Sequence, residues 1–244
     1  LQNDGLIEHL AGELLTVENG ARVKGAAIAR ALDMTRMPDG PHAPGIERRE
    51  DGLLIRHERW TSWIIERPWH DRATLTAWIK QQIARAEAQV FDRAFAEAFH
   101  RRMDDYQGLF GDDTVQVIES GVGLTEIYHP LGWEEFSYLL ADDPGLIEAW
   151  LDARHRAELR RVAAIADPGR IPIALTYDDI AYKTGLLISL RWLREYWVPR
   201  LQALNAAWHE RGALCLFHSD GCLWPILDDL VAASDDPVVR SIAE

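Results

Sequence analysis

The stretch Ala213-Leu-Cys-Leu-Phe-His-Ser-Asp-Gly-Cys-Leu-Trp-Pro-Ile-Leu-Asp-Asp-Leu230 decides the fold class of this chain. Its first five residues are apolar and lie between Gly212 and Gly221, which predicts a strand from Ala213 to Phe217 buried on both faces, as in parallel sheets. A polar turn follows, and Trp224-Pro225 then predicts the start of a helix. Proline is favoured in the first helical turn because a backbone N–H at that position has no partner within the helix. The turn therefore lies where a parallel strand ends and a helix begins, and it carries His218 and Asp220.

The same order of strand, polar turn and helix occurs just upstream. Arg170 to Tyr177 is predicted to be a strand, with two aspartates at its carboxyl end. Ser189 opens a long helical pattern that runs to Arg211 and ends at Gly212. The carboxyl edge of a parallel sheet carries the chemistry of α/β proteins, so we expect four side chains to share that edge: Asp178, Asp179, His218 and Asp220.

The preceding part of the chain extends this alternation. Thr114 to Glu119 is predicted to be a strand, Trp133 to Leu140 a short helix, and Gly145 to Ala166 a long helix capped by Asp143-Pro144. From about residue 114 onward the order is β-α-β-α-β-α, which specifies a parallel sheet. The regular order stops after Ala233, which predicts either a truncated barrel or residues outside the given sequence.

The first 113 residues are predicted to form an extension of helices and a hairpin. Leu6 to Leu15 and Ala26 to Leu32 have short helical patterns, and Asp71 to Tyr106 has the composition and spacing of two helices. Asp51-Gly52 predicts the turn of a hairpin, with Thr61 to Arg67 as a further strand. We treat residues 1–244 as one domain, with 1–113 as the extension and 114–244 as the regular βα units.

Composition limits the class of protein. A length of 244 residues fits one α/β barrel, which usually takes roughly 250 residues, or two small domains. The formal net charge of −13 argues against binding to nucleic acid or to an anionic membrane surface. The two cysteines, Cys215 and Cys222, do not suggest a disulfide framework, and no apolar run is long enough to span a membrane. These features predict a cytoplasmic protein, and they do not bear on its oligomeric state.

Four segments resemble the uroporphyrinogen decarboxylase superfamily, which includes cobalamin-dependent methyltransferases that move methyl groups to thiols such as coenzyme M. They are Tyr177-Asp-Asp-Ile-Ala-Tyr-Lys-Thr-Gly-Leu186, Arg191-Trp-Leu-Arg-Glu-Tyr-Trp-Val-Pro199, Phe217-His-Ser-Asp-Gly221 and Ile226-Leu-Asp-Asp-Leu230. The resemblance covers about Glu119 to Ala233. It implies a (β/α)8 TIM barrel with its active site at the carboxyl ends of the strands.

The chain departs from the superfamily in two ways. The thiol methyltransferases bind zinc through a His-x-Cys pair and a later cysteine, whereas this chain has His218-Ser-Asp220 and no cysteine after Cys222. A carboxylate can replace a thiolate as a zinc ligand, although it leaves the metal less electron-rich. The arginine-rich N-terminal segment by which the decarboxylases hold substrate carboxylates has no counterpart.

Each candidate residue has a catalytic and a structural interpretation. His218 is a metal ligand or an acid–base group, or else a histidine hydrogen-bonded into the rim of the barrel. Asp220 is a second metal ligand or a proton donor, or else a cap of the following helix. Asp178 is a catalytic carboxylate whose pKa is raised by the adjacent carboxylate of Asp179, or else a helix cap or the ion-pair partner of Lys183 or a nearby arginine. The predicted substrate-binding residues are Asp179, Tyr177, Tyr182 and Lys183.

The favoured function is methyl transfer by a corrinoid-dependent methyltransferase. His218 and Asp220 would hold zinc, and a corrinoid protein would be the partner that carries the methyl group to a small-molecule substrate. The first alternative is metal-free decarboxylation of a porphyrinogen, with Asp178 or Asp220 managing the proton. The second is a barrel without catalytic activity that binds a tetrapyrrole or a corrinoid protein.

Overall fold

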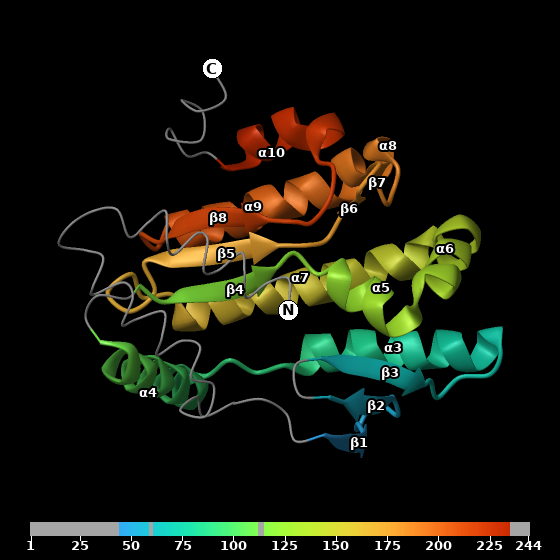
Figure 1. Cartoon of the computed structure of the whole chain (residues 1–244), viewed down its shortest axis with the longest axis horizontal. Helices are drawn as coiled ribbons and strands as arrows, with labels where there is room; N and C mark the ends of the chain where they lie inside the picture. Colours follow the sequence, from blue (N-terminus) through green and yellow to red (C-terminus); the bar gives the residue numbers. More distant parts are fainter. Residues whose placement is uncertain (1–43, 59–60, 112–114, 235–244) are drawn as a thin grey trace.

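A parallel sheet of three strands lies at the centre of the molecule (Figure 1). The computed structural model describes residues 44–58, 61–111 and 115–234, and the helical patterns predicted before residue 44 lie outside them. The strands are β4 (Val117–Gly121), β5 (Ile173–Tyr177) and β8 (Leu214–His218), in the order β4-β5-β8. Each strand lies close to its predicted position, although β4 and β5 begin three residues later than predicted.

The three strands end level with one another. Gly121 pairs with Tyr177, and Tyr177 pairs in turn with His218, and each of the three is the last residue of its strand. The segments that follow β4, β5 and β8 therefore leave the sheet at one edge, as the sequence predicts. This edge brings together residues almost 100 positions apart in the chain.

Helices cover one face of the sheet. Figure 1 shows α7 (Pro144–Ile165) and α9 (Val198–His209) running behind the three strands. Ser120 is fully buried between them: its hydroxyl donates to Glu158 Oε1 of α7 at 2.5 Å and accepts from Trp208 Nε1 of α9 at 2.9 Å. Burial of this polar group is tolerated because both of its hydrogen-bonding functions are satisfied.

The opposite face of the sheet is exposed in the described structure. Leu214 and Leu216 of β8 are 56% and 51% exposed, and Val117 of β4 is 46% exposed. Side chains alternate between the two faces of a strand, so only every second residue of β8 points toward the helices. The prediction that this strand is buried on both faces is therefore wrong.

The α/β class is confirmed, but a closed barrel is not seen. Within the described residues the parallel sheet has three strands and remains open. After β8 the chain forms a short 3₁₀ turn, Trp224–Ile226, and then α10 (Leu227–Ser234), so the predicted helix start is confirmed. The prediction of a single domain over residues 1–244 extends beyond the described residues and stays a prediction.

An antiparallel sheet packs with a helix beside α7. Its strands are β1 (Gly45–Arg48), β2 (Leu54–His57) and β3 (Ser62–Glu66), and the predicted turn at Asp51-Gly52 joins the first two. The next two elements, α3 (Arg72–Ala88) and α4 (Arg93–Phe110), are the predicted pair of helices. Small buried alanines on α3 and α7 let these two helices approach closely: Ala86, Ala153 and Ala157.

The remaining helices surround the carboxyl edge of the parallel sheet. These are α5 (Thr125–Leu131), α6 (Trp133–Asp142) and α8 (Leu190–Trp192), and the last continues through a π-helical segment, η2 (Leu193–Trp197), into α9. Ser189 Oγ caps α8 by accepting from Trp192 N, whereas Asp143 makes no side-chain capping bond at α7. A two-stranded ribbon, β6 (Ala181–Tyr182) and β7 (Gly185–Leu186), follows β5. None of the described helices combines the length and the apolar character that crossing a membrane requires.

Candidate metal and active site

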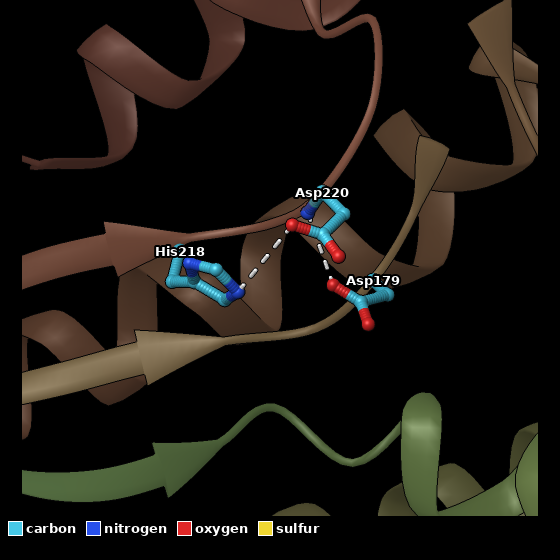
Figure 2. A group of neighbouring side chains, drawn as sticks. All are labelled: Asp179, His218 and Asp220. Carbon is cyan, nitrogen blue, oxygen red and sulfur yellow. Dashed lines mark hydrogen bonds and ion pairs between the residues drawn. The ribbon is translucent and has the colours of Figure 1, made fainter. Parts of the chain in front are cut away.

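Three ligand-type side chains converge where β5 and β8 end. Asp179, His218 and Asp220 each offer one donor atom, and the three atoms lie within 4.8 Å of one another. Figure 2 shows His218 at the end of β8, Asp220 in the loop that follows it, and Asp179 in the segment after β5. His218 Nε2 is 4.0 Å from Asp220 Oδ1, and the backbone N–H of Asp220 donates to Asp179 Oδ1 at 3.0 Å. The structure therefore places the predicted ligand pair together and adds Asp179 to it.

Backbone contacts fix the loop that carries Asp220. Ile180 N donates to Ser219 Oγ at 3.1 Å, and Cys222 N donates to the carbonyl of Tyr182 at 2.9 Å. Gly221 has a φ of +94°, and a Cβ atom there would lie 2.6 Å from the carbonyl carbon of Ala181. Only glycine fits this backbone conformation and this close approach. The loop is thus held against β6 by contacts that any larger residue at position 221 would disrupt.

Asp178 does not join this cluster. Its side chain is fully buried, and its Oδ2 accepts from Leu124 N at 3.1 Å and from Trp197 Nε1 at 2.8 Å, while Oδ1 accepts from Thr125 N at 2.7 Å. Consecutive side chains in an extended segment point in opposite directions, so Asp178 and Asp179 cannot both face the cluster. The structure gives Asp178 a structural environment: it connects β5 to the start of α5 and to η2.

Burial is the main cause that raises the pKa of Asp178, the nearby carboxylate of Glu126 acts in the same direction, and the pKa reaches about 7 from an ordinary value of 3.8. The three N–H donors oppose this shift because they stabilise the charged form. A shifted pKa at a strand end often indicates a catalytic group. Here the carboxylate is surrounded by protein donors and has no exposed surface through which a substrate could reach it.

Tyr177 takes part in a second polar network at the same edge. Its hydroxyl donates to Glu126 Oε1 at 2.9 Å, and Arg154 NH2 lies 3.8 Å from the same oxygen. Burial is the main cause that raises the pKa of Tyr177, followed by the negative charge of Glu126. Neither Glu126 nor Arg154 was predicted as a site residue, because they lie on separate helices and no local motif links them to the strand.

The other two predicted substrate-binding residues lie at the surface. Tyr182 is 60% exposed, and Lys183 follows it in the turn between β6 and β7. Lys183 borders a shallow hollow of about 490 Å³ that continues from the Asp220 loop, together with Gly221, Cys222, Leu223, Trp224 and Leu227. Gly221 and Cys222 directly follow Asp220 in the chain and border the same hollow, so Lys183 lies near the loop that carries Asp220.

Exposure distinguishes the cluster from the buried Asp178. The side chains of His218 and Asp220 are 52% and 82% exposed. Two carboxylates and an imidazole in this arrangement favour a cation, since a cation relieves the repulsion between the carboxylates. Solvent weakens such electrostatic interactions, so we expect the cluster to bind a cation less tightly than a buried site does.

Comparison with known proteins bears on the fold. No family model matches the sequence, and no curated protein sequence matches it. A solved structure, a methyltransferase from Methanosarcina mazei, has a similar fold. The TM-score is 0.50 and the sequence identity is 15%.

The match covers 82% of this chain and 52% of that structure, so the chain spans about half the length of the methyltransferase. At this level of identity the similarity concerns the fold alone. It agrees with the helix-backed parallel sheet.

Proposed function

We propose that this chain forms part of a metal-dependent methyl-transfer enzyme. In this proposal Asp179, His218 and Asp220 hold zinc at the carboxyl edge of the parallel sheet. The observation that carries the proposal is the convergence of these three side chains from two neighbouring strand ends. The likeness in fold to a methyltransferase supports the choice of reaction.

The donor set fits a catalytic zinc ion. Imidazole nitrogen and carboxylate oxygen are both common zinc ligands, and three protein ligands leave a fourth position open for a substrate. With metal–ligand distances of about 2.0–2.2 Å, neighbouring donors of a tetrahedral site lie roughly 3.4 Å apart. The present donors lie within 4.8 Å of one another, and the exposed side chains of His218 and Asp220 can rotate to close that difference.

The protein around the cluster would orient these ligands. The backbone N–H of Asp220 donates to Asp179 Oδ1, which leaves the other oxygen of that carboxylate available to a metal. Asp179 is itself held by its own N–H, which donates to Thr125 Oγ1 at 3.0 Å, and by its carbonyl, which accepts from Tyr128 OH at 3.1 Å. Such outer contacts fix ligand orientation and often decide metal affinity.

Zinc bound at such a site would supply Lewis acidity that keeps a thiol acceptor deprotonated at neutral pH. The reaction we propose is transfer of a methyl group to that acceptor. The acceptor sulfur forms a bond to the methyl carbon while the bond between that carbon and its donor breaks, and the electron pair of the broken bond stays with the donor. We propose a corrinoid carried by a partner protein as the donor, in line with the resemblance of the motifs after β5 and β8.

The described geometry does not favour the decarboxylase alternative. That mechanism needs a carboxylate that touches the substrate, and Asp178 is fully buried with three protein donors around it. Asp220 is exposed, but it lies beside an imidazole and a second carboxylate, an arrangement that suits a cation better than a lone proton carrier.

A methyl-transfer assay tests the proposal. The purified protein, either zinc-loaded or treated with chelator, is mixed anaerobically with methylcobalamin and coenzyme M, and loss of methylcobalamin is followed by its absorbance. We expect turnover only in the zinc-loaded sample, loss of turnover in His218→Ala, and normal turnover in His70→Ala, since the His70 side chain is 78% exposed and lies outside the cluster. Turnover that survives removal of zinc, or that survives in His218→Ala, contradicts the proposal. Zinc binding without turnover would instead favour the non-catalytic alternative.

A further inference from the structure

A cavity separate from the metal cluster is lined by residues of the antiparallel sheet, α3, α5 and α7. Its volume is about 660 Å³, which is within the roughly 300–1,000 Å³ of small-molecule sites. It shares no lining residue with the Asp179–His218–Asp220 cluster. No motif in the sequence indicates it, because its walls come from segments as far as 105 positions apart.

Aromatic and aliphatic side chains form the body of the cavity. Trp78 of α3 and Trp150 of α7 meet edge to face, with ring centroids 5.6 Å apart, and Trp63 of β3 adds a half-exposed indole. Trp78 is held in place because its Nε1 donates to the carbonyl of Asp51 at 2.7 Å. Apolar side chains complete these walls: Leu53, Ile55, Ile64, Ala86 and Pro130. Walls of this kind suit a flat apolar ring.

The charged side chains of the lining favour an anion, although the whole chain carries a net charge of −13. Three arginines line the cavity against two acidic residues. Arg49 lies 3.3 Å from Asp51, and Arg154 lies 3.8 Å from Glu126. Arg85 donates to the carbonyl of Glu50 at 2.9 Å and has no carboxylate partner among the described residues. One guanidinium therefore remains to balance a negative charge in the cavity.

Three buried polar atoms of the lining residues have no hydrogen-bond partner in the described structure. They are Trp150 Nε1, Arg154 Nε and Glu126 Oε2. Trp150 is only 3% exposed, and Trp150 and Arg154 lie one turn apart on the same side of α7. Unpartnered buried donors are rare in folded proteins. The residues that line the cavity thus contain two donors and one acceptor without partners. We infer that these atoms form hydrogen bonds to polar groups of a ligand.

We propose that this cavity binds a small aromatic carboxylate that also bears a hydroxyl group. The ring lies among the tryptophans, and the carboxylate accepts from Trp150 Nε1 and from the arginines at the wall. The hydroxyl donates to Glu126 Oε2. Small adjustments of these side chains expose the three atoms to the ligand, as is common on binding.

Binding of para-hydroxyphenylacetate tests the inference, with its neutral amide, para-hydroxyphenylacetamide, as the matched probe. Isothermal titration calorimetry should show that the acid binds at least about tenfold more tightly than the amide, because charge-assisted hydrogen bonds are the stronger ones. The indole N–H resonance of Trp150, assigned from its absence in the spectrum of Trp150→Phe, should shift on addition of the acid.

Two variants and a control locate the site. Trp150→Phe keeps a ring against Trp78 and removes the indole N–H, and Arg85→Gln removes the guanidinium without a carboxylate partner. Each should weaken binding of the acid by roughly threefold to tenfold. Arg93→Gln makes the same charge change at a side chain that is 92% exposed and outside the cavity, and it should leave binding unchanged. Thermal unfolding of each variant confirms that it is folded.

Three outcomes overturn the inference. They are equal binding of the acid and the amide, an effect of Arg85→Gln no larger than that of Arg93→Gln, and absence of binding of the acid to the unmodified protein at millimolar concentration. None of these outcomes bears on the zinc cluster, since the two sites share no lining residue.

Discussion

Gly221→Ala tests whether the loop after β8 is held as tightly as the structure indicates. Gly221 has a φ of +94°, and an added Cβ would lie 2.6 Å from the carbonyl carbon and 2.7 Å from the carbonyl oxygen of Ala181. A left-handed conformation costs a residue with a Cβ about 1–2 kcal/mol. Contacts with backbone atoms at these distances can be relieved only by moving the loop.

Moving the loop breaks its attachment to β6. The hydrogen bond from Cys222 N to the carbonyl of Tyr182, 2.9 Å long, contributes about 1 kcal/mol. Together the two effects predict that Gly221→Ala lowers the free energy of unfolding by about 2–3 kcal/mol. The same movement carries Asp220 away from Asp179, so zinc affinity should fall as well.

Urea unfolding followed by far-ultraviolet circular dichroism measures the first effect, and competition with a zinc chelator measures the second. Gly108→Ala is the matched control. It lies within α4, where an added Cβ meets nothing within 4 Å, so it should stabilise the protein by up to about 1 kcal/mol and leave zinc affinity unchanged. Unchanged stability and unchanged zinc affinity in Gly221→Ala would show that the loop is not constrained as described.

Three further predictions follow from the cluster and from two buried titratable groups. Asp220→Cys should tighten zinc binding, because a thiolate is a softer donor than a carboxylate; a chelator competition that shows no gain argues against Asp220 as a ligand. Burial, together with the charge of Glu126, raises the pKa of Asp178 from 3.8 to about 7. The protonated carboxyl therefore contributes its full share to the free energy of unfolding below pH 3.8, and this contribution is lost as pH rises through 7. The difference in unfolding free energy between the unmodified protein and Asp178→Asn should therefore shrink between pH 4 and pH 8, and a constant difference refutes the shift. Burial, followed by the charge of Arg200, lowers the pKa of His155 from 6.5 to about 4. The neutral ring therefore stabilises the fold above pH 6.5, and up to about 3 kcal/mol of the free energy of unfolding is lost as pH falls through 4. His155→Leu should flatten that acid limb in urea titrations, and an unchanged limb would assign it to other groups.

Local signals in the sequence were enough to predict most of the elements. The Asp51-Gly52 turn, the capping by Ser189 and the stop at Gly212, whose φ is +84°, depend on backbone conformations that neighbouring residues determine. The level ends of β5 and β8 also follow from sequence, because consecutive parallel strands joined by helices share a carboxyl edge.

The roles of Asp178 and Asp179 could not be distinguished in the same way. Two adjacent residues in an extended segment always point to opposite sides, but which side is buried depends on the helices that cover the sheet. The structure buries Asp178 against Trp197 and leaves Asp179 near His218. The exposed face of β8 was mispredicted for a related reason, since an apolar run does not reveal whether one or both faces are covered.

The cavity beside α7 and the network of Tyr177 with Glu126 depend on contacts between distant segments. Arg49 and Arg154 line one cavity although 105 positions separate them. No periodicity or motif records such a pairing, so only the folded arrangement of α3, α5 and α7 shows it.

A zinc titration tests the central claim most directly. In competition with a chromogenic chelator, we predict one zinc ion per chain. Asp179→Asn, His218→Ala and Asp220→Asn should each weaken it by at least about tenfold, since each removes one of three ligands. Asp228→Asn, an exposed aspartate on α10, should leave the affinity unchanged. Absence of zinc binding, or an Asp179→Asn variant that binds zinc as tightly as the unmodified protein, would contradict a site built by Asp179, His218 and Asp220.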